Sequence, residues 1–145
     1  MQRTLKGQDI PAINGIVDLY NALSLKYVLP MGGEDWSKLR SDLHLTFAQG
    51  NEPFLTMNAG QEEITYPDAG EVIWADNTGV TCRRWNWRQG RRTQLTEATS
   101  SIYFDLDSLA PYPTETLLAA GNELKEHLLA WFPTCTITTE LLQAL

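Results

Sequence analysis

Residues 82–92 are the strongest candidate for binding chemistry in this sequence. The segment reads Cys-Arg-Arg-Trp-Asn-Trp-Arg-Gln-Gly-Arg-Arg and holds five of the eleven basic residues and two of the five tryptophans. Elsewhere six Lys and Arg stand against eighteen Asp and Glu, so a local positive field lies on a chain of net charge −7. Guanidinium groups grip phosphates and indole rings stack on bases, so the segment predicts a docking site for both.

The arrangement of this segment follows from its expected extended backbone over residues 80–87. Side chains of a strand alternate between faces, so Arg83, Trp85 and Trp87 would share one face. A turn over residues 88–91 would form the tip of a hairpin. An equally weighted alternative packs the tryptophans in the core and pairs the arginines with surface acids. The predicted RNA- or anion-binding residues are Arg83, Arg84, Trp85, Asn86, Trp87 and Arg88.

Asp105 is the carboxylate most suited to a ligand site. Its neighbours Phe104 and Leu106 are apolar, so an inward Asp105 needs a partner, which a ligand hydroxyl or ammonium could supply. An outward strand carboxylate is an equally weighted alternative. His44 and His127 lack a second ligand at metal spacing, so no metal is predicted. The sequence has no Gly-x-Gly-x-x-Gly motif and no Walker loop, so no cofactor is predicted either. Any hydrolysis would depend on positioned water and backbone donors.

The elements that would position these residues indicate an α+β domain. Leucine and tyrosine spacing predicts a first helix over residues 14–27 capped by Asn14, followed by an exposed loop from Pro30. Thr114 is expected to cap a later helix that runs to about Trp131. A last short helix is expected over residues 139–145. Strands are expected at residues 43–47, 54–57, 62–65, 72–75, 80–87 and 101–107, in a mostly antiparallel system with helices at both ends.

The length and composition of the chain indicate one cytoplasmic domain over residues 1–145. The length suits a single core, and 43% hydrophobic with 20% charged residues are ordinary globular values. No apolar run is long enough to span a membrane, and no signal peptide is recognisable. Cys82 and Cys135 are too far apart in sequence for a metal-binding pair and are expected to be reduced thiols.

Four ordered blocks carry a resemblance to a known family: residues 17–21 (Val-Asp-Leu-Tyr-Asn), 29–35 (Leu-Pro-Met-Gly-Gly-Glu-Asp), 72–76 (Val-Ile-Trp-Ala-Asp) and 95–99 (Leu-Thr-Glu-Ala-Thr). They resemble the editing and tRNA-binding module of the phenylalanyl-tRNA synthetase β chain, and most of all its free-standing bacterial members. The resemblance covers about residues 10–108, with a C-terminal helical part over 109–145. It implies a three-layer β/β/α sandwich.

The resemblance also implies substrate-binding residues and an activity. Asp105 corresponds to the acid that reads the hydroxyl of a wrongly attached tyrosine, Asn21 and Tyr20 to helix residues of the pocket, and Gly79 to the glycine turn beneath the substrate. This chain departs from the family pattern at Gly32, where a histidine is usual, and at Tyr20, where a threonine is usual. It also departs at the turn, whose later glycines give way to the Arg/Trp segment. A changed pocket implies a different amino acid, or binding without hydrolysis.

Two functions follow as hypotheses. The first is binding of tRNA or aminoacyl-tRNA, with hydrolysis of a mischarged residue in trans; backbone amides near Gly79 would polarise the ester, and the catalytic residues are unknown. The second is non-catalytic binding of a free amino acid or similar small carboxylate, held by the arginines. The free-standing relatives usually begin with a longer extension, so a second copy is expected to cover the surface left open, as a homodimer.

Overall fold

The computed structural model describes residues 12–142 and confirms an α+β fold with antiparallel strands and helices before and after them. The helices are α2 (Gly15–Tyr27), the 3₁₀ turn η1 (Trp36–Lys38) and α3 (Thr114–Trp131). The strands are β1 (Met31–Asp35), β2 (His44–Phe47), β3 (Phe54–Asn58), β4 (Gln61–Thr65), β5 (Val72–Asp76), β6 (Gly79–Arg83), β7 (Arg88–Gln89) and β8 (Ile102–Leu106).

The first two of the three predicted helices are present, but only the first has the expected cap. The Asn14 side chain accepts a hydrogen bond from the Val17 backbone N–H at 3.0 Å, as an N-cap residue does. The expectation for Thr114 is wrong. Thr114 already lies in the first turn of α3, so Pro113 is the cap residue. The proline side chain has no acceptor, and it makes no side-chain cap bond.

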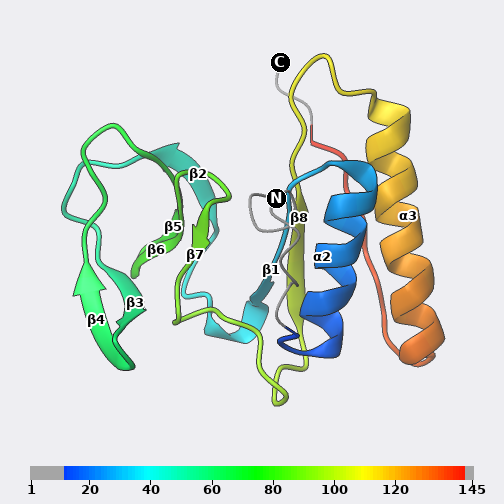
Figure 1. The fold of residues 1–145 in the computed structure, drawn as a ribbon, viewed down its shortest axis with the longest axis horizontal. Helices are drawn as coiled ribbons and strands as arrows, with labels where there is room; N and C mark the ends of the chain where they lie inside the picture. The colour runs from blue at the N-terminus through cyan, green and yellow to red at the C-terminus, as the bar shows by residue number, and fades with distance from the viewer. Residues whose placement is uncertain (1–11, 143–145) are drawn as a thin grey trace.

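The segment after α2 is a strand, not the exposed loop that Pro30 and the two glycines predicted. Met31–Asp35 pairs antiparallel with Ile102–Leu106, and Gly32 lies opposite Asp105. The partner strand is about seventy residues away in sequence, so local patterning could not reveal the pairing. Helices α2 and α3 lie side by side on one side of this β1–β8 pair (Figure 1). Their shared core is built from Tyr20, Leu23, Leu95, Leu124 and Leu128.

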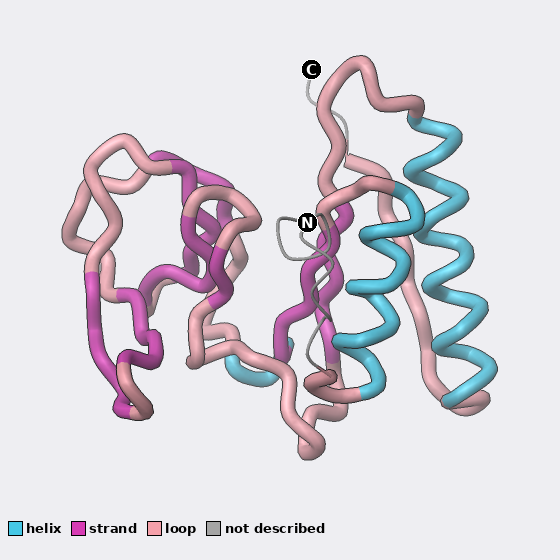
Figure 2. Tube along the Cα trace, viewed as in Figure 1, coloured by secondary structure: helices cyan, strands magenta, loops and turns pink. Residues whose placement is uncertain are grey.

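A second group of strands lies on the other side of the β1–β8 pair (Figure 2). Four strands run in the order β2-β5-β6-β7, and β3 pairs with β4 at the far end of the molecule from α3. Ala48, Phe54, Ile73, Ala75 and Val80 form a separate small core. The β3–β4 connection is tighter than expected, since Ala59 and Gly60, with φ of 48° and 85°, make a two-residue turn.

Two remaining expectations concern the end of the chain and its thiols. Residues 139–142 are not helical, so the expected last helix is wrong for those four positions, and residues 143–145 lie outside the description. The chain returns beside α3 instead, and Ile137 packs against the helical core.

Cys82 and Cys135 are both free thiols. Across residues 12–142, neither helix has the combined length and hydrophobicity needed to cross a bilayer.

Candidate functional site

Strand β8 separates apolar from acidic side chains. Ile102, Phe104 and Leu106 pack toward the helical core. Residues that alternate with them must project from the opposite face of the strand, toward β5 and β6. Those residues are Tyr103, Asp105 and Asp107. Of the two orientations that the sequence left open for Asp105, the structure has the inward one, and the side chain points between the two sheets rather than into the helical core.

The opposite strand makes room for the Asp105 carboxylate. Gly32 faces Asp105 across the β1–β8 ladder, and a Cβ at Gly32 would lie 2.6 Å from Asp105 Oδ1. The glycine thus allows the carboxylate to lie over the β1 backbone. Glu34, two residues on, faces Tyr103 and is only 4% exposed. Because Gly32 and Glu34 share a face, Glu34 projects into the same layer.

Two tryptophans approach this acidic layer from the four-stranded sheet. Trp85 Nε1 donates a hydrogen bond of 2.6 Å to Asp107 Oδ2. The Trp74 indole N–H also faces the Asp107 carboxylate and opposes the rise that burial causes in its pKa, yet it has no acceptor within hydrogen-bonding distance. Gln89 Nε2 donates to the Gly33 carbonyl at 2.7 Å and ties β7 to β1. We call this group the interlayer acid site; it comprises Glu34, Trp74, Trp85, Asp105 and Asp107.

Burial and mutual repulsion change the protonation of these acids. Desolvation, and then the charges of Asp107 and Glu34, raise the pKa of Asp105 to about 7. Burial also raises the pKa of Glu34 and of Asp107, although the Trp85 hydrogen bond opposes the shift at Asp107. Burial and the charge of Asp105 raise the pKa of the nearby Cys82 thiol to about 12, so this thiol is neutral near pH 7. An acid with a pKa near neutrality between two other acids is typical of functional sites.

The Arg/Trp segment does not run on as a strand. Strand β6 ends at Arg83, and Arg84 and Trp85 have φ of 48° and 66°. The turn therefore spans residues 84–87, not 88–91, and β7 follows at once. The predicted alternation of faces is wrong beyond Arg83, because two residues in the left-handed region reverse the chain. The Trp85 backbone N–H donates to the Val72 carbonyl at 2.7 Å and holds this reversal.

The six predicted RNA- or anion-binding residues divide into an engaged and an exposed set. Arg83 makes two hydrogen bonds of 2.8 and 2.6 Å to Glu71, and Trp85 binds Asp107. Arg84 retains 57% of its side-chain surface and lies 3.7 Å from the same Glu71 carboxylate. The exposed set is Arg84, Asn86, Trp87 and Arg88.

Three of the exposed residues form one stacked surface. The guanidinium carbon of Arg84 lies 4.8 Å from the Trp87 ring centroid, and that of Arg88 lies 6.0 Å from it. Trp87 itself is 58% exposed. We call Arg84, Trp87 and Arg88 the hairpin tip. Cations on an exposed indole are suited to grip a phosphate while the ring accepts a base.

The remaining predicted substrate residues lie outside the interlayer acid site. Tyr20 is buried in the helical core, although the Asp105 charge adds to the burial that raises its pKa to about 12. Asn21 is half-buried on α2. Gly79 packs against Pro53, and the amides of Thr78 and Gly79 both donate to Asp76 Oδ1. The Val80 amide donates to the Pro53 carbonyl. These amides are thus not free to polarise an ester.

Sequence reasoning missed Glu34, Trp74 and the role of Asp107. Glu34 and Trp74 even lie in the blocks that carry the family resemblance. The spacing Gly32-x-Glu34 would have placed Glu34 beside Asp105 had residues 31–35 been recognised as a strand. Ile73 and Ala75 lie in the small core. Trp74 stands between them on the strand, so its side chain had to project from the opposite face.

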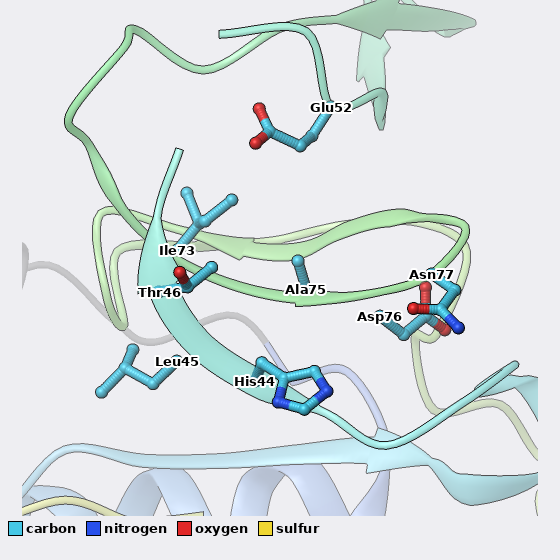
Figure 3. A pocket seen from close by; sticks show the side chains of 8 residues that line it. All are labelled: His44, Leu45, Thr46, Glu52, Ile73, Ala75, Asp76 and Asn77. Carbon is cyan, nitrogen blue, oxygen red and sulfur yellow. The ribbon is translucent and has the colours of Figure 1, made fainter. Parts of the chain in front are cut away.

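A cavity of about 380 Å³ opens on the other face of the four-stranded sheet (Figure 3). The Glu52 carboxylate lies across it from His44 and Leu45. It accepts hydrogen bonds from the backbone N–H groups of Gln49, Gly50 and Asn51, which keep the Glu52 pKa below its usual range. The carboxylate is therefore committed to its own loop. The cavity is lined by His44, Leu45, Thr46, Glu52, Ile73, Ala75, Asp76 and Asn77.

Comparison with known proteins agrees with the resemblance. The model of the B3/4 domain family matches residues 1–119, which include α2, every strand and the start of α3. The chain belongs to the B3/4 domain family, the editing-type domain of the phenylalanyl-tRNA synthetase β chain. No curated protein matches the chain.

Proposed function

We propose that this domain binds the aminoacylated end of tRNA. The hairpin tip is the observation that carries the proposal, because it is an exposed stack of two arginines on a tryptophan. The rest of the chain has a strongly negative net charge. An acidic protein is repelled by nucleic acid in general, so contact must be local. Membership of the B3/4 domain family, which suggests a tRNA-binding or editing-like module, supports the same function.

The interlayer acid site is the proposed place for the aminoacyl group. Trp85 connects the two regions, since it lies in the turn between Arg84 and Trp87 and binds Asp107 through its indole. A tRNA end held by the tip would thus have its terminal ester close to Asp105 and Asp107. Hydrolysis in trans is part of this proposal, with water rather than a side chain as the nucleophile. The three-layer β/β/α sandwich of the family is the proposed architecture for both regions.

The small-carboxylate alternative has less support. This alternative needs unpaired arginines beside the interlayer acid site to bind the ligand carboxylate. However, Arg83 is paired with Glu71, and Arg92 is paired with Asp76. A carboxylate ligand would also meet repulsion from Asp105 and Asp107. Stabilisation by free amino acids without any effect of tRNA would favour this alternative.

We expect the double variant Arg84→Ala/Arg88→Ala to bind tRNA roughly tenfold more weakly in low salt. Each lost phosphate contact also lowers the slope of log K against log salt by about one. Gel retardation and fluorescence anisotropy at several salt concentrations measure both quantities. The matched control is Arg40→Ala/Lys125→Ala, which removes the same charge from exposed positions outside the tip. Equal weakening by both pairs would show that only net charge matters.

Hydrolysis has its own measurement. A panel of tRNAs, each charged with a wrong amino acid, is incubated with the protein, and release of the amino acid is followed against a protein-free reaction. Faster release from at least one tRNA is the expected result. Retention of tRNA without release from any member would leave the domain as a binder.

A further inference from the structure

The buried polar atoms that lack a hydrogen-bond partner gather in one layer of the molecule. Within residues 12–142 they are Glu34 Oε2, Trp74 Nε1 and Thr93 Oγ1. Glu34 projects from β1 into the interlayer, and Trp74 approaches it from β5. Thr93 lies beside Glu34, where it and Thr81 oppose the rise that burial causes in the Glu34 pKa. An unpaired buried donor or acceptor costs about 1–3 kcal/mol. Such atoms are expected where a guest completes the hydrogen bonding.

The charged groups of the interlayer indicate which charge a bound ligand should carry. Asp107 and Glu34 are the charged groups that act on Asp105, and both oppose its ionisation. Arg92 is the cation that acts on Glu34, but it is held by Asp76 through bonds of 3.0 and 2.7 Å. Among the described residues, no cation therefore faces Asp105. A positive group between Asp105 and Asp107 would relieve this repulsion, whereas an anion would add to it.

A metal ion fits the layer poorly. Residues 12–142 contain no group of three potential ligands with the arrangement of a metal site. The free indole N–H of Trp74 is a donor, and a donor calls for an acceptor on the guest rather than for a cation alone. The guest should therefore carry both a positive group and a hydrogen-bond acceptor.

We infer that the interlayer acid site recognises a protonated amino group next to a carbonyl, with Asp105 and Asp107 holding the ammonium and the Trp74 N–H donating to the carbonyl oxygen. Trp85 fixes the Asp107 carboxylate for this contact through its bond of 2.6 Å. An aminoacyl group joined to tRNA has this combination at its α-carbon. The inference rests on the proposed function in that it names the part of the aminoacyl end that this site reads, and leaves the side chain unspecified.

Amide probes test this inference without hydrolysis. Alaninamide and tyrosinamide carry the free ammonium and the carbonyl, and their N-acetyl derivatives keep the carbonyl but lose the charge. Binding to the full chain at pH 7 is followed by tryptophan fluorescence and by the indole N–H signals in NMR spectra. We expect at least one free amide to bind tenfold or more tightly than its acetylated form, and to shift the Trp74 indole signal.

Variants locate the effect. Asp105→Asn should remove the preference for the free amide, while Glu126→Gln, an exposed carboxylate on α3, should keep it. Equal binding of free and acetylated amides, no binding of either, or an unchanged preference in Asp105→Asn would overturn the inference. Retention of uncharged tRNA by the parent protein is measured in parallel with its amide preference. If tRNA is retained without amide preference, only this inference fails; if the preference appears without tRNA retention, the proposed function fails.

Discussion

Gly79→Ala is expected to destabilise the domain by about 3 kcal/mol or more. Gly79 has φ of +150°, a conformation that L residues rarely adopt, and a Cβ there would clash with the Pro53 carbonyl oxygen. That oxygen belongs to the backbone and accepts the Val80 N–H, so it cannot move without loss of this bond. Urea denaturation of the variant and the parent measures the change.

Gly60→Ala is the matched control for this effect. Gly60 also has positive φ, at +85°, but nothing lies within 4 Å of the position its Cβ would take. The control should cost about 1 kcal/mol from backbone strain alone. Similar costs for the two variants would mean that the contact between Gly79 and Pro53 is not tight. In that case the β5–β6 hairpin, which carries Trp74 and leads into the hairpin tip, would be less firmly anchored than described.

Asp105→Asn is expected to stabilise the protein by about 1–3 kcal/mol at pH 7.5 while removing its ligand recognition. The pKa of Asp105 is about 7 in the folded protein, against about 3.9 in an unfolded chain. The folded state therefore binds the proton more tightly, and the free energy of unfolding of the parent falls as the pH rises from about 4 to about 7. Asparagine does not ionise, so the variant lacks this loss. The full shift corresponds to about 4 kcal/mol, which solvent contact at the half-buried carboxylate reduces.

The pH dependence distinguishes this cause from a simple packing effect. The difference between variant and parent should be small near pH 4, grow up to about pH 7 and then remain level. Asp42→Asn, at an exposed carboxylate, should leave the difference near zero throughout. A gain for Asp105→Asn that is the same at pH 4 and pH 7.5, or a loss at pH 7.5, would show that Asp105 is not held in a repulsive, desolvated environment.

The sequence was sufficient where local chemistry decides the structure. The Asn14 cap and the helical spacing of α2 are short-range signals, and both led to the correct element. Family blocks identified the domain type, and Asp105 was placed on its strand, although its direction was left open. These features depend on contacts within a few residues.

Long-range contacts account for what the sequence could not reveal. Residues 31–35 form a strand only because β8 supplies the partner, and the turn at Arg84 and Trp85 is held by Val72 and Asp107. Neither turn residue is a glycine or an asparagine, so no local signal marked the positive φ values. Which arginines are engaged and which are exposed likewise depends on a distant residue, because Arg83 pairs with Glu71, twelve residues away in sequence.

Binding of charged and uncharged tRNA tests most directly whether the hairpin tip and the interlayer acid site act together. A tRNA with its amino acid attached through a stable amide should bind the parent protein about tenfold more tightly than the same tRNA uncharged. Asp105→Asn should bind both forms equally, at the affinity that the parent has for uncharged tRNA. Equal affinity of the parent for both forms, or no retention of either at low salt, would contradict this account.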